Sequence, residues 1–340
     1  DYKAGRNEPV HRPFREETLL ERLIRENSGP MREDQLRAVY REILAMSRQL
    51  QAPQRIACLG PAGTFSHFAG LAFLGRNAEF ELQPNLAAVF EAVNGSDCAL
   101  GVSPLENSLH GSVGQCLDLF LTHAVHITAE FFYPIRHALL SRETDLAKIK
   151  TVFSHPQGLA QCGEWLRRNL PAAQAISVDS TAKAAHLTAE NAHAAAVSHA
   201  ELASGLDLRI LAQNIADQDH NHTRFVLLAP GRLENGAVPA DLPDHGQPAK
   251  TSLLFTLPDR PGALASILGS LAQAQINLSK LESRPCKGED WTYVFFADVA
   301  VNLLGAAYER ILRDLKRNAH ELRILGVYPP GRVIREAGEG

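Results

Sequence analysis

Apolar residues recur at helical spacing in two stripes near the start of the chain, between residues 15 and 51. The stripes are separated by Ser28-Gly29-Pro30, and this arrangement predicts a helical hairpin. The first stripe contains Leu19, Leu20, Leu23 and Ile24, and the second contains Leu36, Val39, Tyr40, Ile43 and Leu44. Two such helices bury too little surface to fold alone. We therefore expect them to pair with the same segment of a second chain and to follow an upstream helix before Asp1.

From Arg55 the pattern changes to short apolar strands that alternate with helices. Strands are predicted at residues 56–59, 98–102, 151–153, 176–178, 194–197, 208–211 and 226–228, and helices at residues 86–93, 113–121 and 159–170. Residues 126–140 form one or two longer strands that carry the chain into a second lobe. This alternation predicts a two-lobed α/β domain over residues 55–230. Lobe one covers about residues 55–130 plus 213–230, and lobe two covers about residues 135–212.

A linker rich in Pro, Gly, Asp and Asn follows at residues 231–248 and separates a third region. In residues 249–329, strands are predicted at 251–257, 276–285, 291–299 and 322–327, with helices at 263–274 and 304–318. This order, βαββαβ in about 80 residues, predicts a ferredoxin-like domain.

Composition and charge narrow the class of protein. The chain has 340 residues, a formal charge of −4 and a pI of about 6.4, so it has no general attraction to nucleic acid or to a membrane surface. The five cysteines are scattered and form no C-x-x-C pair, which argues against a zinc site or a disulfide framework and favours a reducing cytoplasm. The sequence contains no run of about 18 apolar residues, so it predicts no membrane span.

Polar residues follow several of the predicted strands. Four such places are the turn Gly60-Pro61-Ala62-Gly63-Thr64-Phe65-Ser66, the segment Pro104-Leu105-Glu106-Asn107-Ser108, the turn Ser154-His155-Pro156-Gln157 with Gln161 beyond it, and Asp179-Ser180-Thr181. A fifth is Asn221-His222-Thr223-Arg224-Phe225, which opens an apolar strand. Ligands of α/β sheets lie outside the carboxyl ends of the strands, so these segments are expected to converge on one cleft.

Together these motifs resemble the P-protein family, whose prephenate dehydratases carry a chorismate mutase segment in front and a regulatory ACT domain behind. The resemblance covers essentially the whole chain, and it includes Gly262-Ala263-Leu264 and Glu282-Ser283-Arg284-Pro285 as the two effector motifs. It implies a helical segment over residues 1–52, a periplasmic-binding-like dehydratase domain of two lobes, and a ferredoxin-like ACT domain. All of these motifs occur in the order that the family shows.

The resemblance implies that prephenate loses CO₂ and water to give phenylpyruvate. The only unfavourable part of this reaction is the departure of hydroxide, so a single group that protonates or hydrogen-bonds the departing oxygen suffices. Thr223 is the expected donor, and the other expected substrate contacts are Thr64, Ser66, Glu106, Asn107, Ser154, Gln161, Ser180, Thr181, Asn221, Arg224 and Phe225. Arg224 is either a charged contact or an anchor at the strand end. His220 and His222 are alternative acids, as is Glu106 if it is buried.

For the front segment, similarity to the mutase family places chorismate contacts at Lys3, Arg15, Glu16, Ser47 and Gln51. Arg12 stands where that family commonly has Asp, and the arginines of its first helix would lie upstream of Asp1. We therefore expect mutase activity of a longer chain and not of this one, in which the helices would serve to dimerise.

For the third domain, the resemblance implies that phenylalanine binds between two ACT domains and inhibits. The expected contacts are Gly262, Ala263 and Leu264, Asn277 and Leu278, and the motif Glu282, Ser283, Arg284 and Pro285. We expect a cytoplasmic homodimer or tetramer that assembles through the helical segment and the ACT domain, with no metal or organic cofactor. Three alternatives stay open: an arogenate dehydratase, a solute-binding protein that traps a small anion, and a phenylalanine sensor with vestigial lobes.

Overall fold

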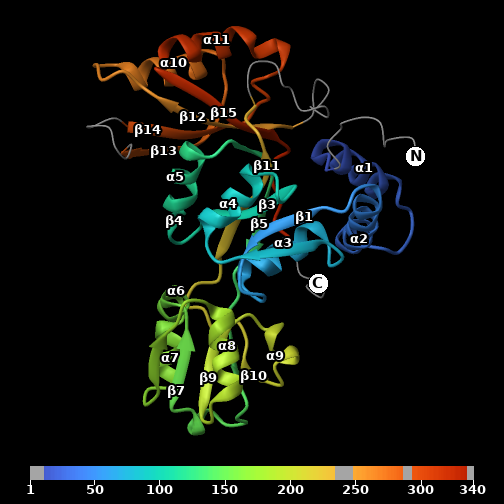
Figure 1. The fold of residues 1–340 in the computed structure, drawn as a ribbon, viewed down its shortest axis with the longest axis vertical. Helices are drawn as coiled ribbons and strands as arrows, with labels where there is room; N and C mark the ends of the chain where they lie inside the picture. The colour runs from blue at the N-terminus through green and yellow to red at the C-terminus, as the bar shows by residue number, and fades with distance from the viewer. Residues whose placement is uncertain (1–10, 234–247, 286–292, 335–340) are drawn as a thin grey trace.

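The computed structural model describes residues 11–233, 248–285 and 293–334. Figure 1 shows these residues in three tiers, with the ferredoxin-like domain above, lobe one in the middle and lobe two below. The helical hairpin stands beside lobe one. The predicted fold class, a helical segment followed by a two-lobed α/β domain and a βαββαβ domain, is confirmed.

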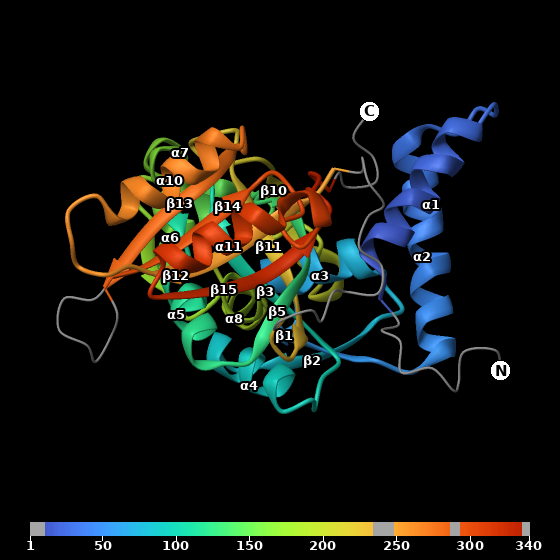
Figure 2. The same ribbon diagram turned by 90° about the horizontal axis from the view of Figure 1, so that it is seen from above.

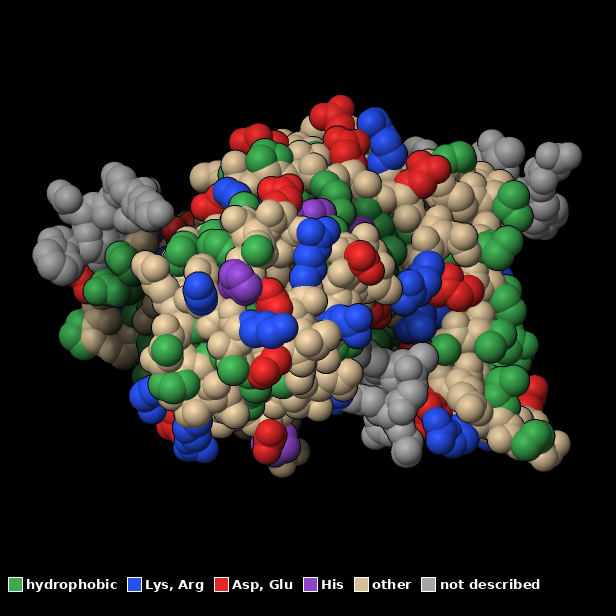
Figure 3. Space-filling view, turned by 90° about the horizontal axis from the view of Figure 1, so that it is seen from below, with side chains coloured by type: hydrophobic (Ala, Val, Ile, Leu, Met, Phe, Trp, Pro, Cys, Tyr) green, Lys and Arg blue, Asp and Glu red, His purple; other side chains and the backbone are tan. Residues whose placement is uncertain are grey.

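The hairpin consists of α1 (Pro13–Glu26) and α2 (Glu33–Gln51). Helix α2 packs against the end of α3, where the Arg48 guanidinium donates to the carbonyl of Leu74 at 2.9 Å. The opposite face of α2 exposes an apolar stripe, visible as the green column on the hairpin in Figure 3. Its members are Val39, Ile43, Met46 and Leu50, which are 47%, 51%, 54% and 86% exposed. A face of this kind requires a partner to be removed from water.

Lobe one is built around parallel strands that are joined by helices. Its elements are β1 (Arg55–Leu59), α3 (Phe65–Leu74), β2 (Glu79–Gln83), α4 (Leu86–Asn94), β3 (Leu100–Asn107), β4 (Gly111–Ser112), α5 (Gly114–Thr122), β5 (Val125–Pro134) and the returning strand β11 (His222–Pro230). The helix starts follow from their caps: the side chains of Thr64 and Asn85 accept hydrogen bonds from backbone amides in the first turns of α3 and α4.

Lobe two is a separate sheet in the order β10-β6-β9-β7-β8. Its elements are β6 (Ala138–Ser141), η1 (Leu146–Lys148), β7 (Thr151–Ser154), α6 (Pro156–Gln161), α7 (Gly163–Asn169), β8 (Gln174–Ser177), α8 (Thr181–Glu190), β9 (Ala194–Ser198), α9 (Leu202–Gly205) and β10 (Arg209–Ala212). The chain enters this lobe after β5 and leaves it before β11. The two lobes are therefore linked by two crossings of the chain.

The ferredoxin-like domain contains β12 (Lys250–Thr256), α10 (Ala263–Gln273), β13 (Leu278–Pro285), β14 (Tyr293–Val299), η2 (Ala306–Tyr308), α11 (Glu309–Asn318) and β15 (Glu321–Tyr328). Figure 2 shows α10 and α11 over the outer face of its sheet. In the described part of the chain this sheet continues into lobe one, in the order β13-β14-β12-β15-β5-β11-β3-β1-β2. The two domains also share one apolar core, in which Phe120 and Val226 of lobe one meet Leu254 and Phe296.

Gly326 makes the junction between the two domains possible. It pairs with Ile127 where β15 runs parallel to β5. A Cβ atom at position 326 would lie 2.2 Å from the carbonyl oxygen of Ile127, so only glycine lets the two backbones approach this closely.

The segment after β15 lies on lobe one and reaches the hairpin. The Phe132 amide donates to the Arg332 carbonyl at 2.9 Å, and the Ile334 amide donates to the Phe132 carbonyl at 2.8 Å. The Arg332 guanidinium pairs with Glu17 at 2.6 Å and with Glu21 at 3.0 Å. The end of the ferredoxin-like domain thus contacts both lobe one and the first helix of the chain.

Three predicted boundaries are wrong. The predicted helix at residues 159–170 is two helices, and Gln161 is the last residue of α6 instead of lying in a first turn. Helix α7 starts separately because the Asp217 carboxylate accepts hydrogen bonds from the Glu164 and Trp165 amides at 2.9 and 3.0 Å. Strand β3 does not end at residue 102 but continues to Asn107, because it pairs with β11 over this stretch. The last helix starts at Glu309, after a turn of 3-10 helix.

Candidate active site

Thr223, Asn107 and Asn221 form one hydrogen-bonded group in lobe one. Strands β11 and β3 are antiparallel and set Thr223 directly opposite Asn107. The Asn107 amide nitrogen donates to Asn221 Oδ1 at 2.8 Å and to Thr223 Oγ1 at 3.0 Å. Asn107 Oδ1 accepts from the backbone amides of Leu109 and His110 at 3.1 and 3.2 Å, which fixes the orientation of its amide group.

This arrangement leaves two hydrogen-bond donors available. Because the Thr223 oxygen already accepts from Asn107, its own hydrogen is free to point to another acceptor. The Asn221 amide nitrogen is buried and has no hydrogen-bond partner among the described residues. Thr223 itself is 8% exposed, so the hydroxyl lies in a largely dry environment where a hydrogen bond is strong.

Gln161 and His137 of lobe two lie at the crossings that lead to this group. The Ile135 amide donates to the Asn221 carbonyl at 2.8 Å, and the Ile215 amide donates to the His137 carbonyl at 3.0 Å. His137 Nε2 is 2.8 Å from Gln161 Oε1, while His137 Nδ1 is buried without a hydrogen-bond partner in the described chain. Burial lowers the pKa of His137 below its usual value, which favours the neutral form of its ring.

Sequence reasoning missed a cluster of aromatic and histidine side chains between the lobes. Tyr133 lies opposite Thr223 on β5, and its hydroxyl is 3.1 Å from His199 Nε2 of lobe two. The His199 ring stacks on Phe68 with centroids 4.2 Å apart, and Phe65 meets the rings of His199 and His137 edge-on. The sequence does place a histidine beside an apolar strand at residues 137 and 199. The strand pattern alone does not distinguish these two histidines from the others.

Five of the expected hydroxyl residues lie at helix starts or inside lobe two. Thr64 Oγ1 donates to the Leu59 carbonyl at 2.9 Å, and Ser154 Oγ donates to the Val197 carbonyl at 2.7 Å. Ser180 caps α8 by accepting from the Lys183 amide at 3.0 Å. The hydroxyl hydrogens of Thr64 and Ser154 are therefore used within the fold. Ser66 and Thr181 are buried in the first turns of α3 and α8.

Arg224 and Glu106 face away from Thr223, because neighbouring residues of a strand point to opposite faces. Arg224 is 5% exposed, and its guanidinium pairs with Asp298 at 2.6 Å, Glu130 at 2.7 Å and Glu106 at 3.6 Å. Burial raises the pKa of the adjacent Tyr328 hydroxyl well above its usual value, and the Asp298 carboxylate adds to the shift. These contacts favour the anchor role for Arg224. Phe225 is in the core, stacked on Phe131.

His220 and His222, the alternative acids, lie where the chain enters β11. The Ser108 hydroxyl donates to the His220 carbonyl at 2.9 Å and accepts from the His222 amide at 3.0 Å. Their backbones thus hold the chain beside Asn221, while the His220 side chain is exposed.

The expected effector residues lie at both ends of α10 and along β13. Gly262 starts α10 with a φ of 83°, and the space around its Cβ position is open. Ala263 is buried and Leu264 half-buried in the first turn. At the other end of α10, the Asn277 carbonyl accepts from the Ala300 amide at 3.0 Å, and Leu278 begins β13.

The motif on β13 alternates in exposure. Ser283 and Pro285 are exposed, whereas Glu282 and Arg284 turn towards lobe one. Glu282 bonds the Ser112 hydroxyl, and Arg284 donates to Asp118 of α5 at 3.1 Å.

The expected mutase residues are not gathered around one cavity in the described part of the chain. Arg15 is exposed, Ser47 and Gln51 bond each other at 3.2 Å, and Glu16 pairs with Arg48 at 2.7 Å. Lys3 lies outside the described residues. Of these residues only Glu16 lines a cavity of about 920 Å³ between the hairpin, lobe one and the segment after β15.

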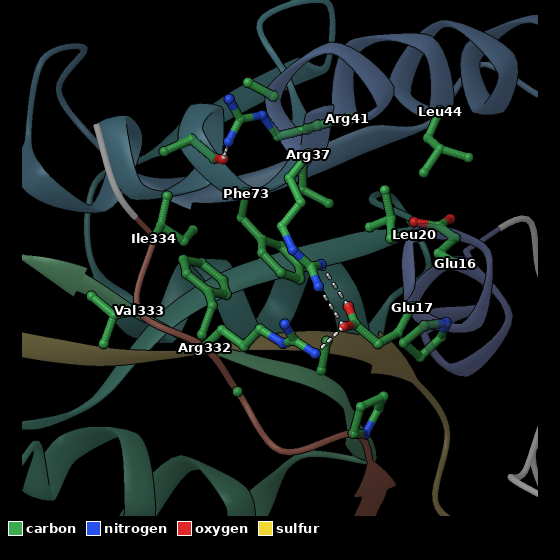
Figure 4. A pocket seen from close by; sticks show the side chains of 18 of the residues that line it. Glu16, Glu17, Leu20, Arg37, Arg41, Leu44, Phe73, Arg332, Val333 and Ile334 are labelled. Atoms are coloured by element: carbon green, nitrogen blue, oxygen red, sulfur yellow. Dashed lines mark hydrogen bonds and ion pairs between the residues drawn. The ribbon is translucent and has the colours of Figure 1, made fainter. Parts of the chain in front are cut away.

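Charged side chains of opposite sign face one another in this cavity (Figure 4). Arg37 and Arg332 both point to Glu17, at 3.3 and 2.6 Å. Arg41 donates to the Ala72 carbonyl at 2.5 Å. The lining guanidiniums are thus already bound by groups of the chain itself.

None of the described helices combines the length and the apolar character needed to span a bilayer.

Comparison with known proteins identifies three regions of the chain. Family models match as chorismate mutase type II over residues 1–52, as prephenate dehydratase over residues 56–232 and as an ACT domain over residues 251–315. A bifunctional chorismate mutase/prephenate dehydratase of Aquifex aeolicus is 38% identical over 333 residues, which are 97% of this chain and 89% of the relative.

Solved structures of known proteins are similar to this chain over 81% of its length. A prephenate dehydratase from Arthrobacter aurescens in complex with L-Phe is 31% identical with a TM-score of 0.72, and the match covers 90% of that chain. GqqA, described as a novel type of quorum quenching acylase, is 29% identical with a TM-score of 0.71 over 98% of its chain. The chain belongs to the family of bifunctional chorismate mutase/prephenate dehydratases, and it is a prephenate dehydratase with a C-terminal ACT domain.

Proposed function

We propose that this chain converts prephenate to phenylpyruvate with Thr223 as the hydrogen-bond donor to the departing hydroxyl. The observation that carries this assignment is the Asn107 amide, which donates to Thr223 Oγ1 and so frees the threonine hydrogen for the substrate. The donor is placed by two antiparallel strands, and its orientation is set by an amide that is itself held by two backbone groups. Such preorganisation is the main source of catalysis where little covalent chemistry is required.

The proposed reaction balances with one proton. The bond from the ring to the carboxylate breaks and releases CO₂, its electron pair moves into the ring, and the carbon–oxygen bond opposite breaks to make the ring aromatic. The departing oxygen takes one proton and leaves as water. Thr223 stabilises the charge that develops on this oxygen, and the proton comes from solvent through the hydroxyl. A donor of this kind contributes about 10²–10⁴ in rate.

Neutral donors would hold the two carboxylates of prephenate. Asn221 Nδ2 has the clearest capacity, because it is buried without a hydrogen-bond partner within the described chain. Gln161 with His137 offers a second polar pair at the crossings between the lobes. We keep Thr64, Ser66, Ser154, Ser180 and Thr181 as surrounding polar groups, and we assign Arg224 and Glu106 to positioning instead of direct contact.

We propose that phenylalanine regulates the enzyme from a site shared by two ACT domains. Gly262 and Asn277 lie at opposite ends of α10, whose 11 residues span roughly 16 Å at the usual helical rise. A single amino acid cannot reach both ends, so one site that uses both requires a second copy. The complex of the Arthrobacter aurescens relative with L-Phe supports the choice of effector.

The exposed stripe on α2 supports a second contact between copies, through the helical segments. We propose a cytoplasmic homo-oligomer that assembles in part through this stripe. Arogenate is the alternative substrate, since it differs from prephenate away from the departing hydroxyl.

The similarity to an acylase shows that this fold can be linked with another activity. Amide hydrolysis by a hydroxyl nucleophile needs an adjacent base. Among the described residues, no histidine or carboxylate makes a hydrogen bond with the Thr223 hydroxyl, which instead accepts from an amide. The geometry favours a hydrogen-bond donor over a nucleophile.

Turnover by Thr223 variants tests the proposal. Thr223→Val removes the hydroxyl at nearly constant volume and should lower kcat about 10²–10⁴-fold, whereas Thr223→Ser should keep most of the activity. Thr188→Val is the matched control: Thr188 is fully buried in lobe two, and its hydroxyl has no hydrogen-bond partner among the described residues. If folded Thr223→Val turns over prephenate as fast as Thr188→Val, Thr223 is not the donor.

A further inference from the structure

The residues next to Asn107 and Thr223 in the sequence form an ion pair on the other face of the same strands. Glu106 lies opposite Arg224 in the pairing of β3 with β11, just as Asn107 lies opposite Thr223. The Glu106 carboxylate is 3.6 Å from the Arg224 guanidinium. One face of this strand pair thus carries the proposed donor group, and the other carries a charged pair whose position is tied to it through the backbone.

The ACT domain holds this ion pair from both sides. Lys280 of β13 is 3.1 Å from Glu106 and donates to the Ser112 hydroxyl at 2.6 Å. Ser112 lies opposite Glu106 in the short pairing of β4 with β3, and Glu282 bonds the same hydroxyl. On the other side, Asp298 of β14 binds Arg224 at 2.6 Å and also accepts from Ser252.

These contacts make a largely buried network of charges. The carboxylates are Glu106, Glu130, Asp298 and Glu282, which lies 3.3 Å from Lys280, and the cations are Arg224, Lys250 and Lys280. Glu130 binds both Arg224 and Lys250, at 2.7 and 2.6 Å. Lys280 differs from the other two cations because it comes from β13, the edge strand that carries the expected effector motif. A movement of β13 therefore changes the charge that faces Glu106.

We propose that Glu106 and Arg224 are positioning residues for Asn107 and Thr223, and that Lys280 is the link through which the effector state of the ACT domain reaches them. The inference rests on the proposed function, because it assigns the route of regulation of the same site. In the structure described here Lys280 holds Glu106 and the β3–β4 hairpin, and so keeps the Asn107 amide against Thr223. An effector that draws β13 away removes this hold, and the donor group loses its alignment. Coupling of this kind needs only that the effector prefers the displaced strand.

The test compares Lys280→Met with wild type in prephenate turnover at saturating phenylalanine, with phenylalanine binding measured separately by calorimetry. Useful feedback corresponds to an inhibition of about 5–150-fold, and in Lys280→Met we expect less than about twofold. Phenylalanine should still bind the variant. Lys316→Met, on the exposed surface of α11, is the matched control in the same domain and should be inhibited like wild type.

A second variant separates positioning from a merely structural role. Glu106→Gln should lower kcat about tenfold with KM within about twofold, because it disturbs the donor and not the binding of the carboxylates. The double variant should behave like Glu106→Gln alone in both kcat and inhibition, since both changes remove the same interaction. Glu106 is half-buried, and if Glu106→Gln does not fold, the inhibition of Lys280→Met decides the question.

Three results would overturn the proposal. The first is full inhibition of Lys280→Met, and the second is the loss of its phenylalanine binding, which would place Lys280 in the effector site itself. The third is an additive effect of the two substitutions on kcat. Absence of prephenate turnover in the wild type is a different failure, because it removes the proposed function and not only its route of regulation.

Discussion

Replacing Gly326 by alanine is a direct test of how the ACT domain is joined to lobe one. The new Cβ would lie 2.2 Å from the carbonyl oxygen and 2.8 Å from the Cβ atom of Ile127. Carbon and oxygen atoms normally stay about 3.3 Å apart, so β15 and β5 would have to separate by roughly 1 Å. The nearest atom belongs to the backbone, so a change of rotamer cannot relieve the clash. Only a shift of one strand can.

The expected cost follows from overpacking, which destabilises a packed interior by about 1–3 kcal/mol. For a domain the size of the dehydratase region, residues 56–232, a loss of this magnitude lowers the melting temperature by about 2–12 °C. The shift of β15 would also move the ACT domain relative to Arg224, so inhibition by phenylalanine should weaken. Thermal unfolding followed by circular dichroism and inhibition of prephenate turnover measure the two effects.

Gly269→Ala is the control for this substitution. Gly269 lies inside α10 of the same domain, and a Cβ there would meet nothing within 4 Å. Alanine in a helix is favoured over glycine by roughly 1 kcal/mol, so this variant should be as stable as wild type or more stable. If Gly326→Ala melts at the wild-type temperature and keeps full inhibition, the close pairing of β15 with β5 is not what joins the domains.

Two further predictions concern charges inside the fold. Asp298→Asn removes a carboxylate from Arg224, and both side chains are 5% exposed. Breaking a buried ion pair of this kind should lower the free energy of unfolding in urea by about 3–5 kcal/mol. A decrease below about 1 kcal/mol would contradict the anchor role of Arg224. Burial lowers the pKa of His11, His126 and His137 below the usual 6.5, so the folded state binds fewer protons than the unfolded state. The stability that these neutral rings contribute is present above pH 6.5 and is lost as the pH falls below it. The melting temperature should therefore drop between about pH 7 and pH 5. A rise of the melting temperature on acidification would contradict the lowered pKa values of these histidines.

The sequence predicts the elements of the site better than their pairing. The helical hairpin, the alternation of strands and helices, and the βαββαβ domain follow from periodicity and turn residues. Strand ends and turn residues predict that the segments of Thr223 and Asn107 converge on one cleft, but they do not predict that these two side chains contact each other. Their contact depends on the register of β3 against β11, more than 100 residues apart in the chain. A shift of that register by one residue would exchange Asn107 for Glu106.

Alternation along β11 places Arg224 on the face away from Thr223, which disfavours the substrate contact that we also expected for it. A guanidinium beside the proposed donor suits a dicarboxylate ligand, and nothing local in the sequence indicates which carboxylates of the chain bind it instead. The carboxylates that bind it, Glu130 and Asp298, lie on β5 and β14, far from it in sequence. Similarly, Asp217 starts α7 from 53 residues away, so the break at Cys162 could not be predicted from the pattern of the helix itself.

Conversion of prephenate by the wild-type chain, followed through phenylpyruvate formation with and without phenylalanine, is the decisive measurement for the proposed activity and its regulation. We predict turnover without an added cofactor and its suppression by phenylalanine. Binding of prephenate without conversion would contradict this prediction, and would instead identify a protein that holds a small dicarboxylate without chemistry.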